Sequence, residues 1–347
     1  MEFDSVDKLK AIRPLGNGHI NVTNLIETTT EKYVLQKVNT HVFKNPIHLM
    51  ENFYRVASHL AKKLKHPHHT IELMYCQDKP YYDAEEVGFY RLYKYIDDAT
   101  TFNVVKNSKM AFQVASAFGT FSQMMEDLPG ERLHETIPNF HNTSQHFARL
   151  EKAIAENKFD RLKEVSKEMD FALSRCEDCS RLIKMQSEGL LKERITHNDT
   201  DIMNVLLNQD ASDWIAIIDL DTVMPGLPHY DFGDMVRSAT SPTRKDETDL
   251  SLVQMRFEIF EALLRGYLSK TGDSMSDIEI EELPFSCKLL ALELGIRFLT
   301  DYLEGDIYFR VHHPRQNLDR CRFNFKLAES IGSQFDNMHK LIKNIRK

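Results

Sequence analysis

The residues best suited to chemistry lie in one segment of the chain, residues 195–221. Asp199 stands in a polar stretch, Asn204 follows five residues later, and an apolar run leads into Asp219. Phosphoryl transfer from a magnesium nucleotide needs one carboxylate that accepts or orients the attacking hydroxyl, together with oxygen ligands for the metal. Asp199 is therefore the candidate catalytic residue, and Asn204 and Asp219 are the candidate magnesium ligands.

The interval from Asp199 to Asn204 equals the interval between aspartate and asparagine in the H-R-D-x-x-x-x-N catalytic loop of kinases. An isolated aspartate in a connecting segment is more often an Asx-turn residue. Two carboxylates and an amide that converge on one loop would repel and desolvate each other without a cation, which favours the functional interpretation. Asp221 is a weaker candidate metal ligand, and His197 is expected to organise the loop through hydrogen bonds. The segment predicts a kinase of small molecules.

Residues 231–233 spell D-F-G, the string that holds the metal in protein kinases. The string follows a proline-rich turn and lies 27 residues past Asn204. Asp219 follows an apolar run and lies 15 residues past Asn204, which is close to the interval that a β-hairpin needs. We therefore assign the metal to Asp219, and we expect Asp231 and Asp234 to start a helix or brace a loop.

Candidate nucleotide-binding residues lie in the first hundred residues, which are predicted to be rich in strands. Residues 12–26 alternate polar and apolar side chains around Gly16 and Gly18, which is typical of a hairpin whose turn can donate backbone N–H groups to phosphates. On the next predicted strand, Gln36 occupies the position where protein kinases carry a phosphate-pairing lysine. Glutamine brings no charge, so Lys37 or a second metal ion is expected to compensate.

The arrangement of the predicted elements indicates an α+β, two-lobed, protein-kinase-like fold. An antiparallel β-rich lobe with one helix is expected over residues 1–95, and a larger, mainly helical lobe over residues 96–347. Tyr95 and Ile96 end the β-rich part and are candidate nucleotide contacts at the hinge. Further expected elements are a helix over 46–65, strands around 70–74 and 88–95, and helices over 109–125, 145–157, 159–186 and 252–271.

A helix expected over residues 289–306 is apolar on most sides, which predicts that it is buried. Its charged residues nevertheless share one face at helical spacing: Glu293, Arg297, Asp301 and Glu304. A surface ladder of ion pairs is the ordinary explanation for such a face. On a buried helix, the same face favours a cleft in which an arginine can bind hydroxyls or an amide carbonyl.

Bulk composition excludes several classes of partner. The net charge of −8 over 347 residues provides no basic surface for nucleic acid, and no apolar stretch approaches the ~20 residues of a membrane span. The five cysteines are odd in number and scattered, which indicates reduced thiols. The acidic start of the chain does not resemble a signal peptide. We therefore expect a cytoplasmic protein, with a monomer as one possible state.

These motifs resemble those of the aminoglycoside phosphotransferase–choline kinase superfamily, and within it the N-acetylhexosamine 1-kinase subfamily. The matching strings extend over nearly the whole chain and stand at residues 18–21, 33–36, 196–200, 218–222, 224–226, 231–234 and 297–309. The last string is long and unusual, and it separates this subfamily from choline and antibiotic kinases. Glutamine at position 36 also appears as a trait of the subfamily.

The resemblance implies that Asp199 is the base facing the O1 atom of a sugar. It also implies that His19, Arg297 and Tyr308 line the sugar pocket, and Asp301 is included with them from the charged helix face. The implied reaction moves the γ-phosphoryl group of MgATP to the C1 hydroxyl of N-acetylglucosamine or N-acetylgalactosamine. ATP and Mg²⁺ are thus the expected cofactors, and a sugar and a nucleotide are the expected partners.

Two alternatives remain open from the sequence. One is a kinase of another small alcohol, such as another hexose, choline, ethanolamine or homoserine. A quaternary ammonium needs an aromatic or acidic cage, to which Tyr308 could contribute, but Arg297 beside it disfavours a cation. The other alternative is a non-catalytic nucleotide- or sugar-binding protein, which has no chemical need for all of Asp199, Asn204 and Asp219.

Overall fold

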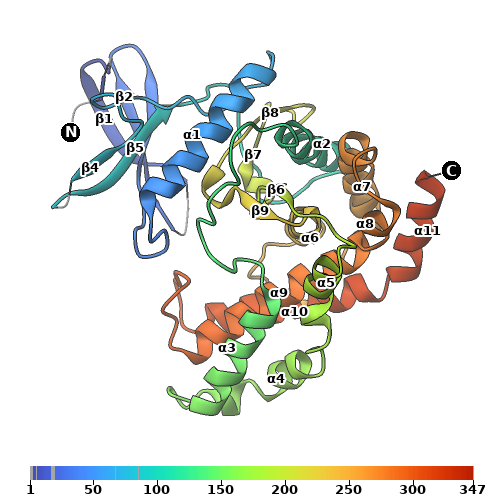
Figure 1. The fold of residues 1–347 in the computed structure, drawn as a ribbon. Helices are drawn as coiled ribbons and strands as arrows, with labels where there is room; N and C mark the ends of the chain where they lie inside the picture. The colour runs from blue at the N-terminus through green and yellow to red at the C-terminus, as the bar shows by residue number, and fades with distance from the viewer. Residues whose placement is uncertain (1–2, 5, 17–19, 67, 85, 347) are drawn as a thin grey trace.

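The structure is a computed structural model, and it describes residues 3–4, 6–16, 20–66, 68–84 and 86–346. It combines an antiparallel sheet near the N-terminus with helices in the rest of the chain, which confirms the α+β class (Figure 1). The sheet has the order β1-β2-β3-β5-β4. Its strands are β1 (Leu9–Pro14), β2 (Val22–Thr28), β3 (Lys32–Lys37), β4 (Tyr82–Ala84) and β5 (Gly88–Lys94). The predicted hairpin over residues 12–26 is confirmed by the pairing of β1 with β2.

The first helix, α1 (Pro46–Lys63), begins where the sequence predicts. The side chain of Asn45 accepts a hydrogen bond from the backbone N–H of His48, and proline at the first helical position has the φ angle that a helix requires. The apolar face of α1 places Leu49 in a buried cluster with Phe89 of β5. The helix is therefore packed against the sheet.

The strand predicted around residues 70–74 is wrong. This segment forms only isolated bridges, from His69 to Ala216 and from Leu73 to Tyr93. Its backbone hydrogen bonds are divided between the sheet and a hairpin farther along the chain, so no continuous ladder forms. The segment therefore crosses between two structures and belongs fully to neither.

After β5 the chain is mainly helical, and the boundary expected at residue 95 stays a prediction. The helices are α2 (Ser108–Met125), α3 (Thr143–Glu156), α4 (Ser166–Leu173), α5 (Arg181–Ser187), α6 (Pro228–Ala239), α7 (Phe257–Thr271), α8 (Asp277–Glu281), α9 (Leu283–Leu303), α10 (Gln316–Gly332) and α11 (Phe335–Ile345).

One continuous helix over 159–186 was the wrong expectation, because α4 and α5 are separated by turns. The Ser174 hydroxyl and the Arg175 guanidinium both donate to the carbonyl of Phe171 at the end of α4. Such local side-chain bonds compete with the next helical turn. The helix expected from residue 252 begins later, at Phe257 of α7.

Two short hairpin-like pairs lie between the sheet and the helices (Figure 1). β6 (Arg194–Thr196) pairs with β9 (Met224–Gly226), and β7 (Val205–Leu207) pairs with β8 (Trp214–Ile217). We call residues 194–226 the catalytic segment. Because its strands are antiparallel, residues that are far apart along this segment meet at its centre.

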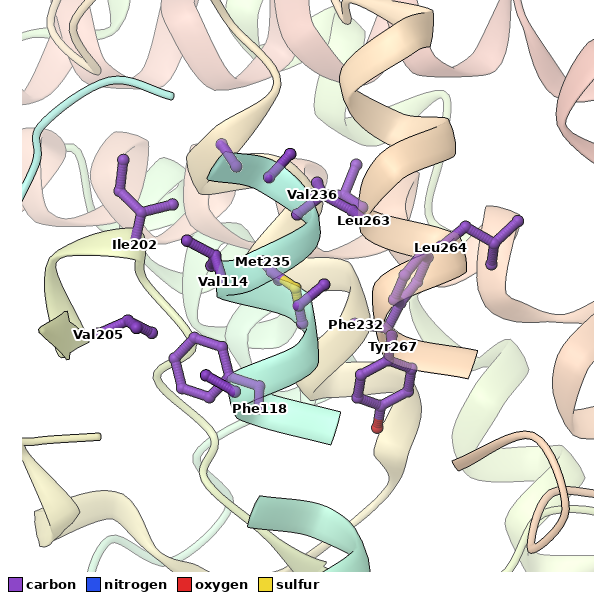
Figure 2. Packing of buried hydrophobic residues seen from close by; sticks show 14 of the residues in the cluster. Val114, Phe118, Ile202, Val205, Phe232, Met235, Val236, Leu263, Leu264 and Tyr267 are labelled. Carbon is purple, nitrogen blue, oxygen red and sulfur yellow. The ribbon is translucent and has the colours of Figure 1, made fainter. Parts of the chain in front are cut away.

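The main core joins the catalytic segment to the helices. Figure 2 shows Phe118 of α2 near Val205 of β7, and Phe232 of α6 beside Tyr267 of α7. The rings of Phe232 and Tyr267 are 5.5 Å apart between centroids, and both side chains are buried. Among the described residues, no helix is both long enough and apolar enough to span a bilayer.

Candidate active site

The loop that carries Asp199 is shaped by hydrogen bonds from outside it. The carboxylate of Asp231 accepts the backbone N–H groups of His197 and Asn198, at 3.0 Å and 2.7 Å. Asn198 adopts a left-handed conformation with φ of 63°, which turns the chain toward Asp199. The buried His197 ring contacts the carbonyl of Ile218 through Nε2 at 3.1 Å. His197 therefore organises the loop, as expected.

The D-F-G string lies inside α6 and has a structural function. Asp231 braces the catalytic loop, and Phe232 is buried in the main core. A Cβ atom on Gly233 would stand 2.6 Å from the carbonyl oxygen of Ser286, so glycine allows α6 and α9 to pack closely. Asp231 is thus engaged in structure, and the metal at Asp219 stays a prediction.

Asn204 and Asp199 are joined directly. The Nδ2 atom of Asn204 donates to the carbonyl oxygen and to Oδ2 of Asp199, both at 2.9 Å. The Oδ1 atom of Asn204 then faces elsewhere, and it has no hydrogen bond to any residue that the structure describes. The expected spacing thus brings the two side chains together.

The β7–β8 hairpin brings Asp219 beside them. Val205 is paired with Ile217, and the backbone N–H of Ile218 donates to the carbonyl of Asn204 at 2.9 Å. Asp219 is in the left-handed region with φ of 60°, a conformation that is strained for a non-glycine residue and often marks a functional site. Its carboxylate is accessible and has no hydrogen-bond partner among the described residues.

The electrostatics of these carboxylates fit a divalent cation. Desolvation by the surrounding protein, with the charges of Asp221 and Asp199, raises the pKa of Asp219 to about 8. Desolvation and the charges of Asp234 and Asp201 raise the pKa of Asp199 to about 7. A cation would offset this repulsion, and carboxylate and amide oxygens are the ligands that Mg²⁺ prefers. The donor set of Asn204 and Asp219 therefore fits magnesium.

The interpretation of Asp221 as a metal ligand needs correction. Its Oδ1 atom lies 2.5 Å from Nη1 of Arg91, and its Oδ2 atom accepts from Nδ2 of Asn21 at 2.7 Å. Its side chain is only 2% exposed. Both carboxylate oxygens are engaged within the protein, so Asp221 is better suited to support the segment around Asp219 than to bind a cation.

Gln36, a predicted nucleotide contact, also differs from what the sequence predicts. The carbonyl oxygen of the Gln36 side chain accepts two hydrogen bonds from Arg91, and its amide donates to Thr23. Gln36 is therefore engaged with its neighbours rather than free to bind a phosphate. The Lys37 ammonium lies 5.6 Å from the centroid of the Tyr90 ring, and its compensating function stays a prediction.

The other predicted nucleotide contacts stay predictions. Gly16 follows β1 with φ of 70°, a conformation that favours glycine. Gly18 lies outside the described residues, as does His19 of the predicted sugar pocket. Tyr95 and Ile96 are half-buried just after β5, where the backbone N–H of Tyr95 donates to the carbonyl of Lys32 at 3.0 Å. They occupy the connection between the sheet and α2.

A second group of possible metal ligands, His48, Glu51 and His134, lies at the start of α1. The two imidazoles are stacked, with centroids 3.8 Å apart and 9° between their planes. Lone pairs in two parallel planes do not converge on one ion. Since Asn52 also binds both backbone groups of His134, the contact is better explained as an attachment of this loop to α1.

A cavity of about 180 Å³ lies beside α9. It is lined by three of the predicted substrate residues, Arg297, Asp301 and Tyr308. The rest of its lining is Ile137, Pro138, Asn139, Phe140, His146, Arg149, Thr300 and Phe309. The charged face of α9 thus borders a cavity, as the cleft interpretation requires.

Within this cavity Asp301 has a different function from the one expected. Its carboxylate accepts the backbone N–H groups of Ile307, Tyr308 and Phe309, at 2.7–3.0 Å, and the side-chain amide of Asn317 at 2.8 Å. Four donors occupy its two oxygens. Asp301 therefore shapes the loop that carries Tyr308 and is not free to bind a substrate.

A buried network joins the cavity to the catalytic loop. His141 contacts Glu293 of α9 through Nδ1 at 2.9 Å and the carbonyl of Asn198 through Nε2 at 2.8 Å. Burial disfavours the charged form, but the charge and hydrogen bond of Glu293 outweigh it and raise the pKa of His141. Burial likewise opposes ionisation of Glu293, yet His141 lowers the pKa of that carboxyl to about 2. Both ring nitrogens face acceptors, so the protonated imidazolium is the form that can donate to both partners.

Two residues of this site, Arg91 and His141, were not identified from the sequence. Arg91 is directly opposite Gln36 in the pairing of β3 with β5, so strand register was the one signal that could have indicated it. His141 lies 152 residues before its partner Glu293, and no local pattern marks it.

The sequence pattern of the phosphotransferase enzyme family, APH, matches residues 11–269. Among solved structures, an aminoglycoside phosphotransferase from Alicyclobacillus acidocaldarius is similar with a TM-score of 0.63 and 10% identity, over 99% of this chain and 94% of that one. An ethanolamine kinase from Plasmodium vivax is similar with a TM-score of 0.58 and 16% identity, over 92% of this chain and 82% of that one.

A third similar structure is a spectinomycin phosphotransferase in complex with ADP and spectinomycin. Its TM-score is 0.56 at 13% identity, over 94% of this chain and 92% of that one. At these identities the structures establish the fold, which is the predicted protein-kinase-like fold. With a family pattern that extends over most of its length, this chain belongs to the APH phosphotransferase enzyme family.

Proposed function

We propose that this phosphotransferase is an N-acetylhexosamine 1-kinase, which transfers the γ-phosphoryl group of MgATP to the C1 hydroxyl of N-acetylglucosamine or N-acetylgalactosamine. The family supplies the reaction class. The observation that carries the acceptor is the cavity beside α9, whose described lining presents the arginine Arg297 and no available carboxylate.

The side chains of the cavity suit a neutral polyol. The Arg297 guanidinium is 3.7 Å from Glu293, too far for a hydrogen bond, so its donors are available for hydroxyl or amide oxygens. Burial lowers the pKa of His146 and favours its neutral form; Nε2 is 2.9 Å from the carbonyl of Phe140 and donates to it, which leaves Nδ1 as an acceptor for a hydroxyl. Phe140 and Tyr308 provide flat apolar surfaces against which a sugar ring can lie.

The catalytic loop would then act on the anomeric hydroxyl. Asp199 orients this hydroxyl and accepts its proton late, because the transition state of phosphoryl transfer is loose. Asn204 and Asp219 would hold Mg²⁺, which when bound neutralises charge on the β- and γ-phosphate oxygens. Asn204 also fixes the Asp199 carboxylate through the 2.9 Å hydrogen bond.

The nucleotide would enter between the sheet and the catalytic segment. The turn after Gly16 would approach the phosphates, and Tyr95 and Ile96 would contact the base. Closure of the two parts around both substrates would exclude water, which is a competing acceptor. The division of the chain at residue 95 belongs to this proposal.

The main alternative function is that of an amino-alcohol kinase, since the similar structures include an ethanolamine kinase. A cationic acceptor needs a free carboxylate or an aromatic cage without a neighbouring cation. Asp301 is the acidic residue in the cavity lining, and its oxygens are already occupied. Arg297 adds repulsion, so the cavity favours the sugar.

The proposal is tested by ADP release across N-acetylglucosamine, N-acetylgalactosamine, glucose, galactose, choline, ethanolamine and homoserine. We expect turnover with the N-acetylhexosamines, and phosphorus NMR of the product should identify an anomeric phosphate. Turnover on choline or ethanolamine without turnover on a hexosamine would refute the proposal that the acceptor is a sugar. Absence of ADP release with every acceptor would favour the non-catalytic alternative.

A further inference from the structure

Arg91 is a buried arginine in the sheet, and it lies where the third strand lacks a charge. In the register of β3 and β5 it is directly opposite Gln36, and its Nε and Nη2 atoms donate to the side-chain oxygen of Gln36 at 2.9 Å and 2.6 Å. Its side chain is 1% exposed. A neutral glutamine on β3 is thus paired with a permanent cation on the neighbouring strand.

The third nitrogen of Arg91 is directed away from the sheet and forms an ion pair. Its Nη1 atom is 2.5 Å from Oδ1 of Asp221, in the catalytic segment. Phe53 of α1 covers the guanidinium, with 4.4 Å between the ring centroid and Cζ. Asn21, just before β2, donates to the other oxygen of Asp221 at 2.7 Å. The sheet therefore holds the Asp221 carboxylate from two sides.

Asp221 is two residues beyond Asp219, within a short 3-10 turn over Leu220–Thr222 that begins directly after Asp219. The backbone of Asp221 is held as well, because its carbonyl accepts from the hydroxyl of Thr136 at 2.8 Å. Asp219 itself has a left-handed conformation and no hydrogen-bond partner among the described residues. The position of its carboxylate consequently depends on how firmly Asp221 is held.

We propose that Arg91 is a positioning residue for the nucleotide side of the reaction. Through Asp221 it orients Asp219 and joins the sheet to the catalytic segment, and it places a permanent cation beside the β3 position where protein kinases carry a lysine. This inference rests on the proposed kinase function only for the metal role of Asp219. Loss of the cation would leave Asp221 buried, unpaired and next to Asp219, where like charges repel.

The first test replaces Arg91 by methionine. Loss of a residue that supports a metal ligand typically weakens metal affinity by about 10–100-fold. We therefore expect the Mg²⁺ concentration needed for half-maximal activity to rise by about the same factor. The KM for the nucleotide should rise with it, and the KM for the acceptor should not. Calorimetry of MgADP binding without acceptor should show the same loss of affinity.

Two double variants distinguish an effect on the position of Asp219 from a general loss of folding. In Arg91→Met/Asp221→Asn both charges are removed, so the protein should fold and bind MgADP no more weakly than Arg91→Met, because the two changes act through one contact. In Gln36→Lys/Arg91→Met a cation is returned to β3, and we expect about tenfold recovery of MgADP affinity through a charge-assisted contact to Asp221.

The matched control is Arg322→Met, which removes an ion pair to Glu168 between α10 and α4, away from the site. MgADP affinity and Mg²⁺ dependence in Arg91→Met that equal those of Arg322→Met would overturn the inference. Additive losses in the double variant would also overturn it. Because MgADP binding needs no acceptor, a wrong hexosamine assignment would leave this test intact.

Discussion

Two buried ion pairs flank the catalytic loop, and they differ in the kind of cation. On the nucleotide side, Arg91 and Asp221 join the sheet to the catalytic segment, and the arginine is charged at every ordinary pH. On the acceptor side, His141 and Glu293 join the loop before α3 to α9, and the histidine can lose its proton. The first pair supports Asp219, whereas the second reaches Asp199 through the carbonyl of Asn198.

This difference separates the two sides of one reaction. The cation of the nucleotide-side pair does not titrate in the ordinary pH range, and this pair depends on the contact between the sheet and the catalytic segment. The cation of the acceptor-side pair, His141, has a raised pKa and loses its proton as pH rises, and the contacts of this pair lie among residues 141–293. Variants on each side should therefore change different kinetic parameters, and the following predictions test that separation.

The largest effect is expected at Asp199, which lies between the two ion pairs. Asp199→Asn should lower kcat by about 10²–10⁴-fold, because the carboxylate that orients and deprotonates the acceptor is lost. Binding of MgADP, measured by calorimetry, should stay close to that of the wild type. A wild-type rate in this variant would remove Asp199 from the mechanism.

A smaller effect is expected when Arg297 is replaced by methionine. Loss of charged hydrogen bonds to a neutral substrate should raise the KM for the acceptor by about 10–100-fold and leave the KM for the nucleotide unchanged. Arg149→Met is the matched control in the same cavity, since Arg149 is already engaged by the carboxylate of Glu304. Equal effects of the two variants would mean that Arg297 has no special contact with the acceptor.

Glu293→Gln should lower the free energy of unfolding by about 1–3 kcal/mol near pH 6, since it breaks a buried charged hydrogen bond to His141. The raised pKa of His141 makes its contribution complete below the ordinary value of 6.5 and lost as pH rises through the folded pKa. The lowered pKa of Glu293 makes its contribution complete above 4.5 and lost as pH falls toward about 2. The difference between wild type and variant should therefore be largest between these values.

Urea unfolding at pH 5.5 and pH 9, chosen as about one unit inside and about 2.5 units above that window, measures this change. Arg91→Met/Asp221→Asn serves as the comparison, because an arginine pair should keep its contribution at the alkaline pH. If Glu293→Gln lowered the free energy of unfolding equally at both pH values, the stabilisation by the His141–Glu293 pair would not depend on the charge of His141.

The smallest effect is expected at an exposed ion pair of the sheet. Lys94 and Glu72 are 3.0 Å apart, with side chains 38% and 64% exposed. Lys94→Met should change each KM and kcat by less than about twofold, because exposed pairs are screened by water and salt. A larger change in nucleotide kinetics would show that any cation on β5, and not Arg91 in particular, supports the site.

Local patterns were sufficient for much of the catalytic segment. The hairpin that brings Asn204 beside Asp219 follows from an apolar run and its distance along the chain, and helix α1 follows from its period and from Asn45. The same reasoning failed for the continuous helix over 159–186, where turns separate α4 and α5. Local side-chain hydrogen bonds there outweigh the apolar period.

What the sequence determined by itself was the chemistry and the order of its parts: a carboxylate, an amide and a second carboxylate on one segment, behind a β-rich region. Only the tertiary structure decided which polar groups are free to act. Asp301 and Asp221 are both engaged by partners elsewhere in the chain, and Gln36 by Arg91. The reason is physical: a buried polar group must find a partner, and that partner is chosen by packing across long stretches of chain.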